Sequence, residues 1–371
     1  MKPSELYLLS LIRSAFGNNA FVLCPQEDDW KEVFALACNQ DVAAIAFDGI
    51  QACYTLNPKS LSSLDTEKNK DLKYDWFGSC ISAEISYGAH IDAITKLATF
   101  YASNNIHLLL LKGYGNSLNY PNPEHRTMGD IDVYLFGEGE RGDELVKEEL
   151  GLHPKQNEDK HSTFKFNDIL VENHANFVND VIHPRLKRLE SFFKADASNS
   201  TPYDFQYKGD SIEVFMPSII TNALFLPLHC ATHFVRGESS LRQLCDWACF
   251  VNKYGQSINW AFVADAVTEA GYYKFYCCLN GIIEEYLGVR QELLPDWPRY
   301  PELQVRILEA FFTRNPSHRL SAFDKFIRFF ASGWKYRLVF RESLFITFLR
   351  QAQSYFRHNN RFAKSLWKKV Y

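Results

Sequence analysis

Several features that would assign this chain of 371 residues to a specialised class are missing. No apolar run reaches the roughly 18 residues that a membrane-spanning helix needs, so we do not expect an integral membrane protein. The N-terminus lacks the pattern of a secretory signal peptide. The nine cysteines have no paired Cys-x-x-Cys spacing, which favours reduced core cysteines over zinc ligands. We therefore expect a protein of the reducing cytoplasm.

The sequence also lacks the signature of a disordered chain. Hydrophobic residues make up 46% of it and aromatic residues 15%, which is ample for the cores of two or three domains. The formal net charge of −4 is unevenly distributed, because 13 lysines and arginines but only two acidic residues occur from Phe312 onward. The end of the chain is therefore basic and the remainder acidic.

Two aspartates, Asp130 and Asp132, are separated by one apolar residue in a stretch that predicts a strand. Because successive strand side chains point to opposite faces, both carboxylates project to one side while Ile131 and Val133 project into a core. Carboxylates about 7 Å apart repel one another unless a cation lies between them. Mg2+ prefers oxygen ligands and is often completed by substrate phosphates. The pair indicates a metal site for phosphate chemistry, although an isolated Asp-x-Asp can also be a solvated strand edge or turn.

Basic residues accompany these acids. Upstream, the apolar run 106–111 leads into Lys112 and Gly113. A strand that ends in a glycine turn presents backbone N–H groups to an anion, and Lys112 adds a positive charge there. Arg126 adds a planar donor group suited to phosphate. We expect Lys112, Gly113 and Arg126 to bind a nucleotide.

A third carboxylate is needed to hold a second metal and to accept a proton from an attacking hydroxyl. Glu172 is the candidate, because residues 164–174 predict a hairpin with a two-residue turn at Asn167 and Asp168. Glu172 and His174 then share one face of the strand. A buried carboxylate is costly without a partner, and metal ligation would supply one.

A set of residues spread over fewer than 70 positions forms a larger pattern. It consists of Lys112-Gly113, Tyr120-Pro121, Pro123, Arg126, Met128-Gly129-Asp130-Ile131-Asp132, Glu172 and His174. With this pattern the chain resembles the DNA polymerase β-like nucleotidyltransferases, in particular a branch known as uncharacterised nucleotidyltransferases. The resemblance implies a small mixed sheet with flanking helices, Mg2+ on the three acids, and transfer of a nucleoside monophosphate from an NTP to an acceptor.

The chain departs from the wider superfamily at one point. That superfamily usually has glycine-serine after the first strand, whereas here Lys112 precedes Gly113 and Tyr114 follows it. Ser117 is the candidate to replace that serine in nucleotide binding, although its position is also typical of an ordinary helix or turn residue.

Helical periodicity dominates both sides of this core. Apolar residues recur at helical spacing up to Asn104, the polar residues 56–73 suit a surface connection, and the polar segment 198–209 suits a linker. From Pro217 onward helical periodicity returns. We predict an α+β fold with an N-terminal helical region (1–106), a nucleotidyltransferase-like core with a small mixed β-sheet (107–216) and a C-terminal helical region (217–371).

Two helical pairs in the C-terminal region can reach the site. His229 and His233 lie four residues apart, as do Arg242 and Asp246, so each pair shares a helix face. The histidines lack the following glutamate of a zinc protease pattern, and no third ligand is identifiable. The alternatives are satisfied polar side chains with an internal Arg242–Asp246 ion pair, or a supporting role at the site. His174 is a further candidate for such a supporting role.

The basic tail, residues 332–371, is also aromatic. Phe340, Phe345, Phe348 and Tyr355 fall near one helical face, with arginines around them. Such a helix can dock on the acidic remainder of the protein, lie on an anionic membrane surface, or bind nucleic acid. We favour docking first and a membrane surface second, which would place the protein peripherally at the inner face of the membrane. Nucleic acid ranks last, because no binding motif accompanies the charge.

The predicted reaction is in-line attack of an acceptor hydroxyl on the α-phosphorus of an NTP, with two Mg2+ ions on Asp130, Asp132 and Glu172 and with pyrophosphate leaving. Lys112 and Arg126 would stabilise the phosphate charge. Two other classes stay open. One is a non-catalytic nucleotide-binding protein of antitoxin type, and the other a scaffold or peripheral membrane protein acting through its tail. A metal-dependent phosphohydrolase could use the same carboxylates with water as acceptor.

Overall fold

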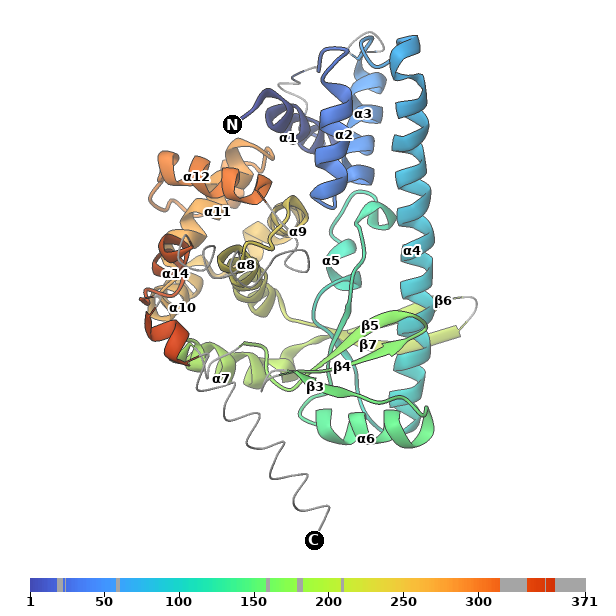
Figure 1. The fold of residues 1–371 in the computed structure, drawn as a ribbon. Coiled ribbons are helices and arrows are strands. Elements are labelled where there is room, and N and C mark those ends of the chain that lie inside the picture. Colours follow the sequence, from blue (N-terminus) through green and yellow to red (C-terminus); the bar gives the residue numbers. More distant parts are fainter. Residues whose placement is uncertain are drawn as a thin grey trace.

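The N-terminal part of the molecule is helical (Figure 1). The computed structural model describes residues 1–18, 23, 25–57, 61–157, 161–178, 183–207, 210–313, 332–343 and 345–350. The chain begins with α1 (Pro3–Ala15), α2 (Trp30–Asn39), α3 (Ala43–Leu56), the short 3-10 helix η1 (Glu67–Asn69) and α4 (Lys70–Ser103). Helix α4 has 34 residues and runs along one side of the molecule, from the other N-terminal helices to the sheet.

A seven-stranded mixed sheet follows, with the strand order β3-β4-β5-β2-β1-β7-β6. Its strands are β1 (Leu109–Leu110), β2 (Ile131–Tyr134), β3 (Lys155–Asn157), β4 (His161–Phe166), β5 (Ile169–His174), β6 (Thr201–Tyr207) and β7 (Asp210–Met216). Strand β2 is parallel to β5 and β1 is parallel to β7, whereas the other neighbours are antiparallel. The predicted α+β fold with a mixed sheet is confirmed.

The hairpin predicted around Asn167 and Asp168 is present. Strands β4 and β5 pair from Phe166 with Ile169 back to His161 with His174. Both turn residues have positive φ, 49° at Asn167 and 63° at Asp168. A two-residue hairpin turn with positive φ at both positions matches the twist of the strands, and Asn and Asp tolerate that conformation.

The linker expected at residues 198–209 is wrong for most of its length. Strand β6 begins at Thr201 and pairs with β7 at the edge of the sheet. Tyr203 and Phe205 alternate with polar residues; Phe205 belongs to the hydrophobic core beneath the sheet, and the partly buried Tyr203 packs against that core. The polar residues dominate the composition of the segment, but the alternation of aromatic side chains determines its structure.

The two faces of the sheet pack against different helices. On one face Ile131, Val133 and Val171 share a core with Leu97 and other residues of α4 and with α6 (Gly139–Glu149). The opposite face carries Leu109, Leu111 and Tyr134, which share a core with the C-terminal helices. The site described below lies on this second face.

The C-terminal part is helical, as predicted. Its described helices are α8 (Ile219–Arg236), α9 (Leu241–Tyr254), α10 (Trp260–Ala270), α11 (Tyr273–Glu285), α12 (Pro301–Phe312) and α14 (Gly333–Val339). Helix α7 (Lys187–Asp196) lies earlier, between β5 and β6, within the range predicted for the core. Short 3-10 helices connect several elements, namely η2 (Pro123–His125), η3 (Pro184–Leu186), η4 (Ala197–Asn199), η5 (Gly255–Ser257) and η6 (Gln291–Leu293). Side chains of α1–α3 and of these helices form one continuous core.

Part of the basic tail lies within the described residues. Phe340 is buried and stacks on His183 with the ring centroids 3.6 Å apart, and His183 Nδ1 is 3.1 Å from Glu342 Oε2. Phe345 and Phe348 are exposed. This part of the tail therefore docks on the protein through Phe340. Residues 351–371 lie outside the described residues, so the membrane contact of the tail stays a prediction.

None of the helices within the described ranges is long and apolar enough to cross a membrane.

Candidate active site

Strands β2 and β5 bring two predicted metal ligands together. Asp132 is the direct register partner of Glu172 in their parallel pairing, so both side chains lie on the same face of the sheet. Ile131 and Val133 point into the opposite core, as strand alternation predicts. Asp132 is only 2% exposed. Asp130 lies directly before β2 and is half-buried.

His174 lies closer to these carboxylates than the sequence suggested. Its Nε2 is 2.8 Å from Asp132 Oδ1 and 3.4 Å from Glu172 Oε2. One potential ligand atom of each of these three residues lies within 4.8 Å of the others. Within the described ranges, Asp132, Glu172 and His174 form the group of His, Cys, Asp or Glu side chains that lie close enough together to hold a metal ion. Asp130 is not part of this group. Two carboxylates with an imidazole fit a divalent cation, whereas the predicted ligand role of Asp130 stays a prediction.

The pKa values of both carboxylates are lowered in spite of their burial. Burial opposes ionisation of Asp132, but the charge of Lys112 and the hydrogen bond from His174 outweigh it and lower the pKa of Asp132. Burial also opposes ionisation of Glu172, yet its pKa falls to about 2 because His174 donates to it and because His161 and Lys112 lie nearby. The site is therefore a cluster of negative charges balanced by basic side chains.

Lys112 supplies most of that balance. It follows β1, and its Nζ lies 2.7 Å from Asp132 Oδ1 and 3.0 Å from His229 Nε2. Burial works against its charge, but Asp132 and the other site carboxylates raise the pKa of Lys112 above its ordinary value. The next residue, Gly113, has φ 63° and ψ −109°, a backbone conformation that residues other than glycine rarely adopt. Gly113 therefore allows the chain to turn from β1 into the four-residue helix α5 (Tyr114–Ser117).

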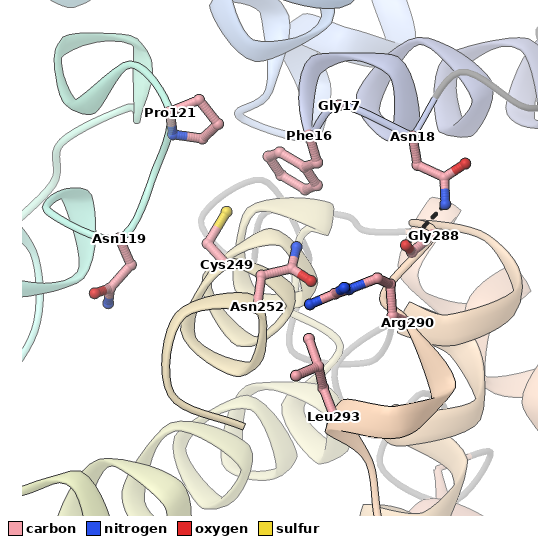
Figure 2. Close-up of a pocket in the computed structure, with 10 residues that line it drawn as sticks. All are labelled: Phe16, Gly17, Asn18, Asn119, Pro121, Cys249, Asn252, Gly288, Arg290 and Leu293. Carbon is pink, nitrogen blue, oxygen red and sulfur yellow. Dashed lines mark hydrogen bonds between the residues drawn. The ribbon is translucent and has the colours of Figure 1, made fainter. Parts of the chain in front are cut away.

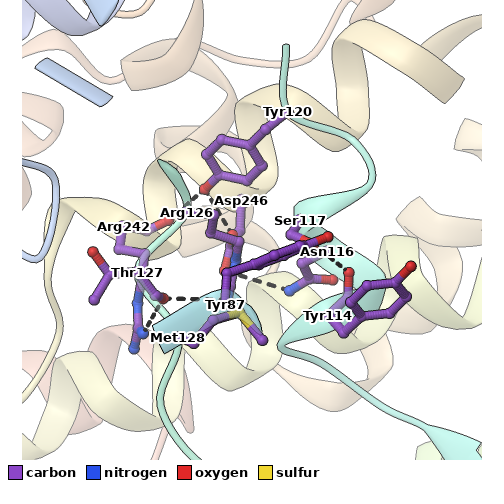
Figure 3. Close-up of polar contacts among 10 residues, drawn as sticks. All are labelled: Tyr87, Tyr114, Asn116, Ser117, Tyr120, Arg126, Thr127, Met128, Arg242 and Asp246. Carbon is purple, nitrogen blue, oxygen red and sulfur yellow. Dashed lines mark hydrogen bonds and ion pairs between the residues drawn. The ribbon is translucent and has the colours of Figure 1, made fainter. Parts of the chain in front are cut away.

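Arg126 contacts Asp246 of α9 and not an open surface (Figure 3). Arg126 Nε is 2.7 Å from Asp246 Oδ1, and Arg126 Nη2 is 2.9 Å from Oδ2. The same carboxylate accepts hydrogen bonds from the Tyr120 hydroxyl at 2.7 Å and from Asn116 Nδ2 at 3.4 Å. Burial disfavours the Asp246 carboxylate, but Arg126 outweighs it and lowers the pKa of Asp246. The phosphate contact expected of Arg126 stays a prediction, because its guanidinium edge already binds Asp246.

The ion pair expected between Arg242 and Asp246 is replaced by this arrangement. Arg242 Nη1 donates instead to the carbonyl of Thr127 at 2.9 Å, and its Nε is buried without a hydrogen-bond partner among the described residues. Asp246 binds Arg126 because the fork of a guanidinium can bind both carboxylate oxygens at once. Arg242 is thus the arginine with an unsatisfied donor at the site.

Helices α8 and α9 are held at the site by a sharp turn. Gly237 ends α8 with φ 74°, and Ser240 begins α9 with a capping box formed with Gln243. On α8, His233 Nε2 lies 3.0 Å from His229 Nε2, which in turn contacts Lys112. The two histidines are not part of the group of potential metal ligands in the described part of the chain. Their position favours a supporting role over zinc binding.

One narrow pocket gathers most of the predicted residues. Its lining consists of Lys112, Gly113, Asn116, Arg126, Gly129, Asp130, Asp132, Leu226, His229, Arg242, Gln243 and Asp246. Its cavity volume is only about 30 Å³. Ser117 is not among the lining residues, because it is fully buried and its hydroxyl donates to the carbonyl of Tyr114 at 2.6 Å. Glu172 and His174 are also not among the lining residues, but they adjoin Asp132, Glu172 as its strand partner and His174 through its Nε2.

Some residues of the site carry no signal in the sequence. His90 of α4 contacts the carbonyl of Gly129 with its Nε2 at 2.6 Å and the carbonyl of Ser86 with its Nδ1 at 2.7 Å. It thereby fixes the backbone directly before Asp130. Asn116 and Gln243 line the pocket, but neither belongs to a recognisable spacing pattern. Only the tertiary fold brings these residues to the carboxylates.

A second and larger pocket lies between the end of α1, the segment before η2, α9 and residues 288–293 (Figure 2). It has a cavity volume of about 530 Å³. Its lining includes Phe16, Asn119, Cys249 and Arg290. It contains none of the predicted carboxylates. Helix α9 therefore contributes Asp246 to one pocket and Cys249, one turn further on, to the other.

Comparison with known proteins agrees with this geometry. A family model described as uncharacterised nucleotidyltransferase matches residues 26–288, which is more than half of the chain. The chain belongs to this family. The matched region begins before α2, ends after α11 and includes every residue named at the carboxylate site. No curated protein and no solved structure matches the chain. Nucleotidyl transfer is therefore the general chemistry of the family.

Proposed function

We propose that the protein transfers a nucleoside monophosphate group from an NTP to a hydroxyl group of an acceptor, with the help of a divalent cation. The observation that carries this proposal is the pairing of Asp132 with Glu172 on adjacent parallel strands, in contact with Lys112 and beside Arg242. Paired carboxylates bind a cation that neutralises phosphate charge, and the basic side chains bind the phosphates themselves.

The residues at the site would have different roles in this reaction. Asp132 and Glu172 would hold the cation, and Asp130, which lines the same pocket, would accept the proton of the acceptor hydroxyl. Arg242, which lines the same pocket, would bind the triphosphate through its guanidinium group. The carboxylate oxygens by themselves are ligands that suit Mg2+. A bound cation would neutralise negative charge at the α-phosphate and at the leaving pyrophosphate.

Lys112 has to change its partner for this to happen. A cavity of about 30 Å³ does not hold a triphosphate. The Lys112 ammonium lies on Asp132 Oδ1, where it balances the charge that a cation would balance. We infer that Lys112 leaves Asp132 Oδ1 when the cation enters, which frees a ligand oxygen, and that it binds the phosphates once the nucleotide is present, which opens the pocket.

The test is label transfer from each of the four NTPs, labelled at the α-phosphate, to acceptors in a fractionated extract. Glu172→Gln removes the charge but keeps an amide near His174, and it should lower transfer by about 100-fold or more. Asp168→Asn is the matched control, because it makes the same acid-to-amide change in the exposed turn of the same hairpin and suits positive φ. Transfer should be unchanged in that variant.

Three outcomes would overturn the proposal. Equal transfer by wild type and Glu172→Gln would remove the carboxylates from the chemistry. Cation-dependent NTP binding, measured by titration calorimetry, without transfer to any fraction would favour the non-catalytic nucleotide-binding protein. Release of inorganic phosphate without a labelled acceptor would instead indicate a phosphohydrolase.

A further inference from the structure

An imidazole, and not a third carboxylate, completes the ligand group of this site. His174 Nε2 lies 2.8 Å from Asp132 Oδ1 and 3.4 Å from Glu172 Oε2. Metal–ligand distances of about 2.1 to 2.2 Å place adjacent ligand atoms of an octahedron about 3 Å apart. The two distances from His174 Nε2 are close to this spacing, and one ligand atom of each of the three residues lies within 4.8 Å of the others.

The His174 ring is held firmly in this position. Its side chain is fully buried, and it lies at the end of β5 opposite His161 of β4. The rings of the two histidines pack with their centroids 5.3 Å apart. Backbone pairing and burial thus fix the direction of Nε2, which is what a preorganised ligand requires.

The other nitrogen of the ring has the partner that metal-bound histidines usually have. His174 Nδ1 lies 3.4 Å from the carbonyl oxygen of Asn176. Histidines that bind metals commonly donate their second N–H to a carbonyl or carboxylate, which directs the lone pair of the first nitrogen at the metal. In the tautomer that donates from Nδ1, the Nε2 lone pair points at two carboxylates. A cation between the three groups would relieve the repulsion in that tautomer, whereas without a cation Lys112 Nζ, 2.7 Å from Asp132 Oδ1, balances the charge of Asp132.

We propose that His174 is a direct metal ligand together with Asp132 and Glu172, and that the site therefore binds a first-row transition ion such as Mn2+ more tightly than Mg2+. Mg2+ takes oxygen ligands almost entirely, whereas imidazole nitrogen is a ligand for transition ions. This inference deepens the proposed function and rests on it for the place of the cation. Its alternative is that His174 only orients Asp132 by a hydrogen bond.

The first experiment uses the full-length wild-type protein with Mn2+ as the probe and no nucleotide. Pulsed electron paramagnetic resonance detects the nuclear spin of a nitrogen bonded directly to Mn2+. We expect modulation from one coordinated imidazole nitrogen. Bound Mn2+ without nitrogen modulation would overturn the proposal and leave His174 as an orienting residue. Absence of Mn2+ binding would overturn it as well.

The second experiment compares the affinities of variants for Mn2+ and Mg2+ by titration calorimetry. His174→Gln keeps a donor for Asp132 but removes the nitrogen ligand, so the Mn2+ affinity should fall at least about tenfold while the Mg2+ affinity changes much less. His153→Gln is the control, because His153 is exposed and lies outside the site. An equal loss for both ions would count against ligation by nitrogen.

These readouts separate the inference from the proposed function. Nitrogen modulation in a protein that transfers no nucleotide would support the metal site and contradict the transferase. Label transfer by a protein whose bound Mn2+ shows no nitrogen ligand would support the transferase and contradict ligation of the metal by His174.

Discussion

Arg126 and Asp246 form a two-point ion pair that joins the loop before β2 to helix α9. The two residues are 120 positions apart in the sequence, and both are buried. Asp130 follows Arg126 by four residues, so this pair fixes the end of the segment that carries the first site carboxylate. The contact links the sheet to the C-terminal helices at the site.

Breaking this pair should destabilise the protein. Asp246→Asn leaves the buried Arg126 guanidinium without a counter-charge, and loss of one partner of a buried pair typically costs about 3 to 5 kcal/mol. Urea unfolding should therefore show a free energy of unfolding lower by several kcal/mol. Glu309→Gln is a control, because its ion pair with the N-terminus is partly exposed and should be worth less than about 1 kcal/mol. Similar stability of the two variants would contradict a structural role for Asp246.

The stability of the ion-free protein should depend on Glu172 at acid pH. The pKa of Glu172 is lowered from 4.5 to about 2 in the folded protein. A lowered folded-state pKa gives stability that is fully present above the unfolded-state value and is lost as the pH falls through the folded-state value. Free energies of unfolding measured in the presence of a chelator should therefore fall between about pH 5 and pH 2. In Glu172→Gln this decline should be shallower, and an unchanged slope would argue against the ion contacts of Glu172.

Local features of this fold follow from the sequence. The turn at Asn167 and Asp168 depends on two adjacent residues that tolerate positive φ, and the pairing of β4 with β5 follows from that turn. The common face of Asp132 and Glu172 follows from strand alternation within two short segments. Each of these inferences needs only residues that are close together in the chain.

Other features depend on contacts between distant segments. The phosphate contact of Arg126 stays a prediction, but nothing near Arg126 in the sequence identifies Asp246 as its ion-pair partner. The same holds for His90, which reaches Gly129 from the middle of α4. Strand β6 was missed because polar residues obscured the alternation of Tyr203 and Phe205. In all three cases the tertiary packing, and not the local pattern, decides the role.

His90 should act on catalysis through the backbone. His90→Phe fills a similar volume but cannot contact the Gly129 carbonyl, so Asp130 loses part of its support. Misplacement of a catalytic group by about 1 Å can lower the rate by about 100-fold. We expect a reduced kcat for nucleotide transfer with little change in the KM for NTP. His107→Phe serves as a control, because His107 is exposed and contacts only aromatic rings in the described structure. Equal effects of the two changes would show that His90 has no positioning role.

Gly113 tests whether the turn after β1 holds Lys112 in place. Gly113→Ala forces an alanine into φ 63° and ψ −109°, which costs about 1 to 3 kcal/mol of stability. The cost comes from the backbone and not from a clash, because the atom nearest to the added Cβ, the Asp130 carbonyl oxygen, is 3.6 Å away. Gly78→Ala makes the same change within α4, where an added Cβ meets nothing within 4 Å, and it should stabilise the helix by up to about 1 kcal/mol. Opposite signs in thermal unfolding are therefore expected for the two variants. If Gly113→Ala is stabilising as well, the strained turn does not hold Lys112 against Asp132.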